Sequence, residues 1–277
     1  MDLGLPAGEV AVLVVALIGG GLLTGLLSGL FGVGGGGIMV PVLYELFNAL
    51  DVPVEIRMHM AVGTTFAIII PTGIRSGLAH YRRGSLDPKL LRTLGPAVVF
   101  GVVLGLIVAR YSGDTGMKGV WVLSASLIAL YSFFGDKSWR LGADMPGVLV
   151  EVPVGIIVGF LATLMGVGGA AFLVPFITLY SRPIHQAVGT SAGIGSLIAI
   201  PAMLGYIWAG LGATGLPPGS VGYVSLLGAA LMMPASVLAA PFGVRMAHGL
   251  TRRQLELGFG VFISLVALRF IVALAWA

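Results

Sequence analysis

The sequence predicts an all-α polytopic membrane protein of about ten segments, arranged as two inverted-topology repeats of five. Of its 277 residues, 57% are hydrophobic and 9% are charged, whereas a soluble domain carries roughly 25% charged residues. Apolar runs of membrane-spanning length follow one another along the whole chain. Similar glycine-rich motifs also occur twice, in the same order. We therefore expect a first repeat over 1–134, a cytoplasmic connection over 135–146 and a second, inverted repeat over 147–277.

Ten apolar runs between polar breaks predict the individual segments. They lie near 9–31, 37–50, 59–79, 94–111, 118–134, 147–165, 171–181, 187–209, 221–243 and 255–276. The second and seventh are too short to cross a core of about 30 Å at 1.5 Å per residue. Since each of them follows a glycine-rich break, segments 1–2 and 6–7 are predicted to form broken or re-entrant helix pairs.

The distribution of Lys and Arg predicts the orientation. Connections after odd-numbered segments hold ten basic residues: Arg82, Arg83, Lys89, Arg92, Lys137, Arg140, Arg182, Arg245, Arg252 and Arg253. Connections after even-numbered segments hold only Arg57, Arg110 and Lys118. Because basic residues favour the cytoplasmic side, the odd connections are expected in the cytoplasm and both termini outside it. So few and dispersed charges do not favour nucleic-acid binding.

An internal repeat carries the functional interpretation. Leu30–Pro41 reads LFGVGGGGIMVP and Leu164–Pro175 reads LMGVGGAAFLVP, with seven of twelve positions identical. His59–Thr65 reads HMAVGTT and His185–Ser191 reads HQAVGTS, with five of seven identical. Because each half holds five segments, the second half enters the membrane from the opposite side. Inverted repeats with broken helices are typical of secondary transporters, whose substrate site lies near the bilayer midplane.

The two glycine clusters are predicted to bind an anion. They match a dinucleotide-binding fingerprint, but membrane spans flank them instead of the strand that such a site needs. A helix that starts after the glycines directs free N–H groups and a positive dipole end at a ligand. Tight helix crossing is the alternative, and we favour binding. The candidate residues are Gly34, Gly35, Gly36, Gly37, Pro41, Gly168, Gly169, Ala170 and Pro175.

Four hydroxyls, those of Thr64, Thr65, Thr190 and Ser191, follow the two histidines at equivalent places. They either line the substrate path or bond back to the i−4 carbonyl of their own helix. The stretch around Ser191 matches a nucleophile elbow, but that motif requires a strand-to-helix turn. With no base or orienting carboxylate placed by the sequence, a hydrolase is excluded and no enzyme activity is expected.

Three titratable residues are candidates for proton coupling: His59, His185 and Glu45. The histidines could equally be interfacial residues at the mouths of segments 3 and 8. Arg269 lies inside segment 10, and the sequence identifies no partner for it. The acidic residues fall in connections or near segment ends, with Glu45 the one case at membrane depth. Since a cation carrier would need carboxylates near its midplane, an anionic substrate is favoured.

The chain resembles the TauE/SafE family of sulfite exporters. The resemblance lies in GLFGVGGGGIMVP, LMGVGGAAFLVP, the paired HxAVGT[ST] stretches and LPPGSVGY…APFGVRMAH, and it covers nearly the whole chain. It implies a secondary transporter of the bacterial cytoplasmic (inner) membrane for a small sulfur-containing anion, such as sulfite or a sulfonate. The family's glycine-rich motifs fall on Gly32–Pro41 and Gly166–Pro175, although the second departs from a full glycine run.

We therefore expect export of such an anion by alternating access, with the lipid bilayer as surroundings and with neither cofactor nor metal. An uptake carrier for an organosulfur compound and a channel-like anion pathway are the alternatives. The physiological anion, the coupling ion and the oligomeric state are not specified by the sequence.

Overall fold

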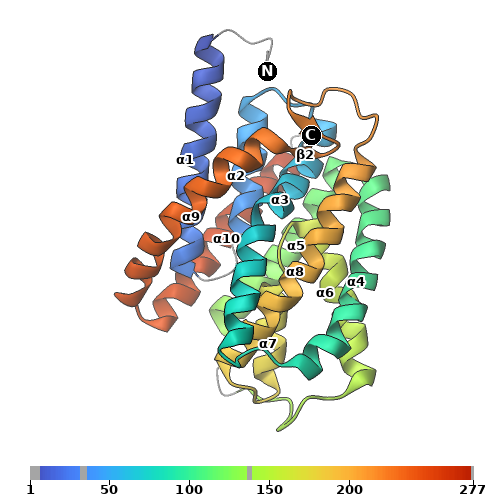
Figure 1. The fold of residues 1–277 in the computed structure, drawn as a ribbon, viewed down its shortest axis with the longest axis vertical. Coiled ribbons are helices and arrows are strands. Elements are labelled where there is room, and N and C mark those ends of the chain that lie inside the picture. Colours follow the sequence, from blue (N-terminus) through green and yellow to red (C-terminus); the bar gives the residue numbers. More distant parts are fainter. Residues whose placement is uncertain (1–6, 32–35, 136–138, 276–277) are drawn as a thin grey trace.

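The fold is a bundle of helices with one short β-hairpin (Figure 1). The computed structural model describes residues 7–31, 36–135 and 139–275, and these residues form ten helices and two strands. In chain order they are α1 (Ala7–Phe31), α2 (Gly36–Ala49), α3 (Val54–Arg82), α4 (Pro88–Tyr111), α5 (Asp114–Phe134), α6 (Val148–Met165), α7 (Ala170–Leu179), α8 (Ile184–Ala209), β1 (Ser220–Val221), β2 (Val224–Ser225), α9 (Leu226–His248) and α10 (Arg252–Ala275).

Helix lengths agree with the segments that the sequence predicts. Within the described residues, seven helices are long and apolar enough to cross a membrane, namely α3, α4, α5, α6, α8, α9 and α10. Helices α2 and α7 have only 14 and 10 residues, which at 1.5 Å per residue reach about 21 Å and 15 Å. The prediction that these two segments are too short to span is confirmed.

The ninth segment begins later in the structure than the sequence predicts. The sequence predicts this segment over 221–243, but α9 begins at Leu226 and a hairpin precedes it. The hairpin pairs Val221 with Val224 in antiparallel register, and Gly222 supplies the positive φ of 54° at its turn. A short apolar run of this kind is compatible with a strand and with the start of a helix, because hydropathy alone does not distinguish the two.

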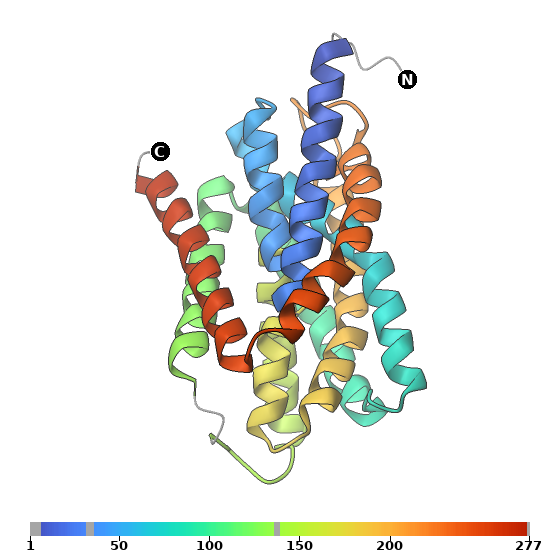
Figure 2. The same cartoon turned by 90° about the vertical axis from the view of Figure 1, so that its left-hand side faces the viewer.

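The two short helices each return to the end from which their preceding helix came. Figures 1 and 2 show α1 running inward from the end of the molecule where the N-terminus lies and α2 returning toward it. Helix α6 runs inward from the opposite end, and α7 returns to that opposite end. The start of α2 and the interruption between α6 and α7 therefore lie inside the bundle.

The most extensive helix contacts join helices that are far apart in the sequence. Helix α1 packs along α9, α4 along α6, and α3 along α8. Glycines make the first two crossings close: a Cβ on Gly21 would lie 2.7 Å from the carbonyl oxygen of Met232, and one on Gly101 would collide with that of Ile156. Glycine at these positions therefore permits close helix crossing. Because every pair joins one predicted half to the other, the two halves share one core.

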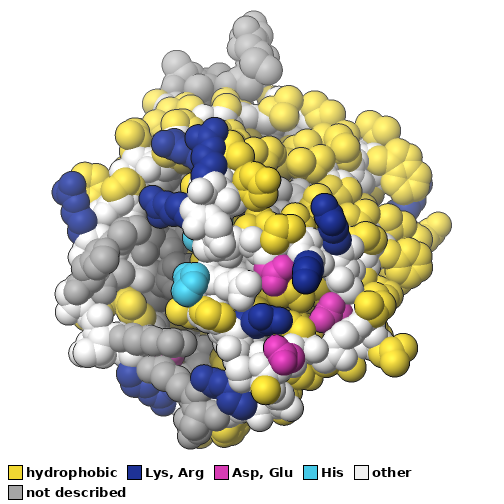
Figure 3. All heavy atoms as spheres, turned by 60° about the horizontal axis from the view of Figure 1, so that its bottom comes forward, with side chains coloured by type: hydrophobic (Ala, Val, Ile, Leu, Met, Phe, Trp, Pro, Cys, Tyr) yellow, Lys and Arg dark blue, Asp and Glu magenta, His cyan; other side chains and the backbone are white. Residues whose placement is uncertain are grey.

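Basic residues gather at one end of the molecule, which we call the basic end. The connections α3–α4, α5–α6, α7–α8 and α9–α10 lie toward this end, whereas α1 begins and α10 ends toward the other, which we call the terminal end (Figures 1 and 2). Figure 3 shows the basic end with many Lys and Arg side chains and fewer Asp and Glu. Exposed residues there include Arg82, Arg83, Lys89, Arg92 and Arg140.

Candidate functional site

The start of α2 contacts the glycine-rich interruption between α6 and α7 inside the bundle. Gly36, the first residue of α2, is buried, and a Cβ there would collide with the carbonyl oxygen of Gly166 and lie 2.8 Å from the Cα of Val167. Gly166 ends α6 in the left-handed region with φ 73°. The predicted residues Gly34 and Gly35 lie outside the described residues. Only glycine allows the two backbones to approach this closely, so the described part of the first cluster has a packing role at least.

The second interruption ends at a helix start that no side chain caps. Gly169 precedes α7 with φ 76°, in a conformation that favours glycine, and no side chain accepts a hydrogen bond at this N-cap. Its carbonyl accepts the N–H groups of Phe172 and Leu173 at 3.1 and 2.9 Å. The earlier N–H groups of the first turn have no intrahelical acceptor. Helix α7 therefore offers backbone donors and a positive dipole end toward the interruption.

Gly168 faces helix α8. A Cβ added at Gly195 of α8 would lie 3.0 Å from the carbonyl oxygen of Gly168, and one added at Gly168 would lie 3.7 Å from the Cα of Gly195. Ser191 lies one turn before Gly195 on the same face of α8. The Ser191 hydroxyl is buried and has no hydrogen-bond partner among the described residues.

The predicted prolines lie within the short helices, beyond the interruptions. Pro41 is buried inside α2 and Pro175 is half-buried inside α7. Proline has no N–H to donate to the carbonyl four residues earlier. In this way Pro41 frees the carbonyl of Gly37, and Pro175 frees that of Ala171, both in the first turn after an interruption.

The other three predicted hydroxyls are occupied by the protein itself. Thr65 donates to the carbonyl of Ala61 at 2.7 Å, so the back-bonding alternative is confirmed for this residue. Thr64 accepts the backbone N–H of Ser225 at 3.0 Å, and Thr190 accepts that of Asp87, also at 3.0 Å.

Thr64 and Thr190 make equivalent hydrogen bonds, each to the residue just before a helix. Asp87 is the N-cap of α4 and accepts the N–H of Lys89 at 2.8 Å, while the Ser225 hydroxyl accepts the N–H of Gly228 just inside α9 at 3.1 Å. Each HxAVGT[ST] motif thus fixes the residue that precedes a helix of the other half. We call these two hydrogen bonds, with their preceding glycines, the Gly-Thr clamps.

The glycine of each motif permits this contact. A Cβ on Gly63 would lie 2.5 Å from the carbonyl oxygen of Tyr223, and one on Gly189 would lie 2.5 Å from that of Ser85. Real Cβ atoms do not approach oxygen this closely. The duplicated motif therefore has the same structural use on α3 and on α8, a use that sequence reasoning did not anticipate.

The two predicted histidines differ in burial. His59 is 4% exposed, and its Nε2 lies 2.9 Å from the carbonyl oxygen of Ala109. Its ring centroid lies 4.9 Å from that of Tyr223, and its Nδ1 has no partner among the described residues. His185 is exposed at the start of α8. The two histidines thus lie in different surroundings, because His59 is enclosed by protein and His185 is not.

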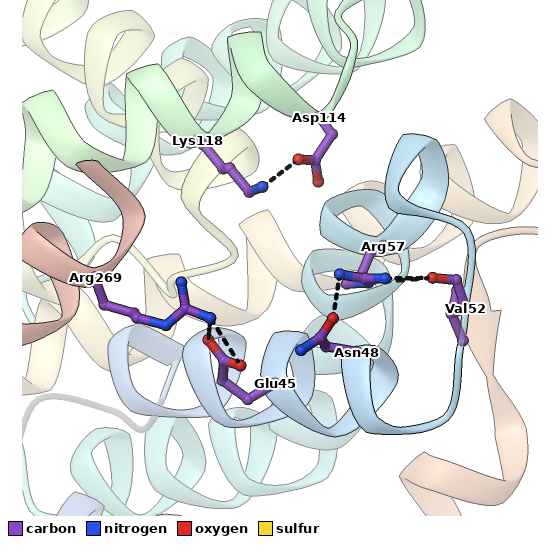
Figure 4. A network of polar contacts seen from close by, with 7 residues as sticks. All are labelled: Glu45, Asn48, Val52, Arg57, Asp114, Lys118 and Arg269. Carbon is purple, nitrogen blue, oxygen red and sulfur yellow. Dashed lines mark hydrogen bonds and ion pairs between the residues drawn. The ribbon is translucent and has the colours of Figure 1, made fainter. Parts of the chain in front are cut away.

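Charged side chains form a network near the terminal end (Figure 4). Arg269 of α10 lies 3.3 Å from Glu45 of α2, and both side chains are about half exposed. Arg269 thus has the partner that the sequence could not identify. Lys118 lies 2.5 Å from Asp114 one turn earlier in α5, and both side chains are buried. The i,i+4 spacing of acid and base was the sequence signal for this pair, which the sequence reasoning missed.

Two cavities open away from the interruptions. One of about 380 Å³ lies at the basic end between α5, the end of α7 and the start of α10, with Trp139, Thr178 and Arg182 in its lining. A smaller one of about 170 Å³ lies beside Phe47 and Pro217. These two cavities therefore do not reach the described residues of the glycine interruptions.

Comparisons with known proteins agree with this architecture. The family model described as sulfite exporter TauE/SafE matches residues 17–270. A probable membrane transporter protein of Haemophilus influenzae is 32% identical over 249 residues, which cover 90% of this chain and 94% of the relative. One of Methanocaldococcus jannaschii is 26% identical and covers 94% and 96%, and one of Bacillus subtilis is 27% identical and covers 74% and 84%. No solved structure matches the chain.

Proposed function

Because the chain belongs to the TauE/SafE sulfite exporter family and is a membrane transporter, not an enzyme, we propose that it exports a small sulfur-containing anion by alternating access. The anion is of the sulfite or sulfonate type. The contact of Gly36 with Gly166 is the observation that carries this proposal, because it places the first residue of α2 against the interruption that leads from α6 into α7.

Chemistry at these helix starts suits an anion. The first turns of α2 and α7 supply backbone N–H groups and positive dipole ends, which stabilise negative charge. The site comprises the glycines, Ala170 and the prolines named above, with Ser191 as the available hydroxyl. The other three hydroxyls support the site without being free to bind the anion, since they are hydrogen-bonded to backbone groups. These are the hydroxyls of Thr64, Thr65 and Thr190. Half-helix N-termini that face an anionic substrate are common in secondary transporters.

The proposed halves are α1–α5 and α6–α10, with opposite orientations. The basic end faces the cytoplasm, since connections rich in Lys and Arg stay on that side, and both termini lie outside in a bacterial inner membrane. The opposite directions of the α1–α2 and α6–α7 pairs support this arrangement (Figure 2). Inverted halves favour alternating access over an open channel, since transporters with such repeats move one repeat against the other.

Among the candidates for proton coupling, His59 is the best placed. It is buried and keeps one ring nitrogen without a partner, whereas Glu45 is paired with Arg269 and His185 is exposed. An uptake carrier would use the same site, because orientation does not set the direction of transport. Counterflow of labelled anion in proteoliposomes separates a carrier from a channel, since only a carrier exchanges one anion for another.

The site is tested by adding one methyl group where it fits. A Cβ at Gly168 or Gly37 makes only ordinary contacts, at 3.7 Å or more, so Gly168→Ala and Gly37→Ala leave the fold intact. We expect each to weaken binding of sulfite, sulfate, thiosulfate and taurine to the purified protein. Gly119→Ala is the matched control, because nothing lies within 4 Å of a Cβ there. Wild-type affinity in both site variants would show that the anion binds elsewhere.

A further inference from the structure

Two opposite charges are buried together near the terminal end of α5. The Lys118 ammonium lies 2.5 Å from Asp114 Oδ2, and the two side chains are 5% and 8% exposed. The neighbouring pair of Glu45 and Arg269 is instead 44% and 51% exposed. Burying charge away from water is expensive, so a buried pair calls for an explanation that an exposed pair does not.

This pair is not arranged for stability alone. The hydration free energy lost when an ion pair is buried is about as large as the free energy gained from the attraction between the charges. Such a pair stabilises a fold only where every remaining polar atom has a hydrogen-bond partner. Asp114 Oδ1 is buried and has no partner among the described residues. The Nδ1 atom of His59, a residue on which the charge of Asp114 acts, is also buried without one. The carboxylate thus has a position open for a proton.

Further donors without acceptors follow along the same helix. Trp121 Nε1 and Ser124 Oγ are buried, at 0% and 1% residue exposure, and have no partner among the described residues. They lie about 4.5 Å and 9 Å deeper than Lys118 along α5, at 1.5 Å per residue. An ammonium, an indole N–H and a hydroxyl in succession are donors that an oxyanion needs and that a cation does not.

We propose that Lys118 binds the transported anion as the anion moves toward the terminal end. Asp114 is the counter-ion of Lys118 when no anion is bound, and protonation of Asp114 breaks this ion pair. This inference rests on the proposed function and assigns the coupled proton to Asp114 in place of His59. A proton from water adds to the Asp114 carboxylate, the neutral acid releases Lys118, and the anion takes its place. Departure of the anion and loss of the proton restore the pair.

The charged and titratable groups around the pair come from four further elements. Helix α2 presents Tyr44, whose ring centre lies 4.7 Å from the Lys118 ammonium. Helix α3 presents His59, and also Arg57, whose guanidinium lies 5.5 Å from the same Tyr44 ring. Tyr223 stacks on His59 from the hairpin, and Arg269 of α10 is held by Glu45 (Figure 4).

Binding of sulfate to the purified protein, measured at about pH 5.5 and pH 8, tests the proposal. Sulfate keeps its charge across this range, so any change in affinity belongs to the protein. We expect wild-type affinity to be at least about tenfold higher at the lower pH. Asp114→Asn should bind tightly at both values, and Lys118→Gln should bind at least about tenfold more weakly at both. Arg110→Gln, an exposed cation at the same end, is the matched control and should behave as wild type.

The outcomes separate this inference from the proposed function. A pH-dependent affinity in Asp114→Asn, or wild-type affinity in Lys118→Gln, would overturn the inference while anion binding by the wild type upholds the function. A wild type that binds none of the four anions would overturn both. If an unpaired Lys118 prevents Asp114→Asn from folding, the double variant Asp114→Asn/Lys118→Gln removes both charges. It should bind weakly without pH dependence, and a retained pH dependence would refute the proposal.

Discussion

Replacing Thr64 by Val removes one Gly-Thr clamp while nearly preserving side-chain volume. The hydroxyl of Thr64 is the acceptor for the Ser225 N–H at 3.0 Å, and both residues are buried. Val leaves this backbone donor without a partner, which costs about 1–2 kcal/mol, since an unsatisfied buried donor costs roughly 1–3 kcal/mol and hydrogen bonds in membranes lie at the lower end. Thr190→Val should cost a similar amount through Asp87.

Neighbouring residues of the same motifs provide the controls. Thr65 is as buried as Thr64, but its hydroxyl only bonds back to Ala61, so Thr65→Val should cost less than about 0.5 kcal/mol. Ser191→Ala removes a buried hydroxyl that has no described partner and should leave stability unchanged or slightly higher.

Unfolding of the detergent-purified variants in increasing dodecyl sulfate, followed by tryptophan fluorescence, measures these differences. Binding of sulfite gives the second readout: Thr64→Val and Thr190→Val should keep their affinity while folded, whereas Ser191→Ala should lose affinity at unchanged stability. Equal costs for Thr64→Val and Thr65→Val would refute the structural role that we assign to the clamp.

Two further predictions concern packing and orientation. Gly25→Ala should destabilise the protein by more than about 2 kcal/mol, because its Cβ would collide with the backbone of Ser236, while Gly19→Ala, with open space around it, should not; the same unfolding assay measures both, and equal stabilities would contradict the α1–α9 crossing. Since the chain has no cysteine, Tyr111→Cys and Arg83→Cys each introduce a single thiol at opposite ends; a membrane-impermeant maleimide should label only Tyr111→Cys on intact cells, and the reverse pattern would invert the proposed topology.

The ten helices of the described residues, two of which are short, follow from local properties of the chain. Hydrophobic length and glycine-rich breaks are visible in the sequence because a bilayer core imposes the same requirement on every span. The positions of α2 and α7 agree with the predicted segments to within a few residues. Only the hairpin before α9 was missed, since a short apolar stretch does not distinguish strand from helix.

Contacts between distant residues required the folded molecule. Thr64 and Thr65 are adjacent and chemically identical, yet one holds a connection 161 positions away and the other bonds back to its own helix. Arg269 finds Glu45 across 224 positions, and no periodicity in either helix indicates that contact. Composition, span lengths and the repeated motifs can thus be recognised in the sequence alone. Which donor meets which acceptor depends on how helices from the two halves pack against each other, because a side chain reaches only what the fold brings within a few ångströms of it.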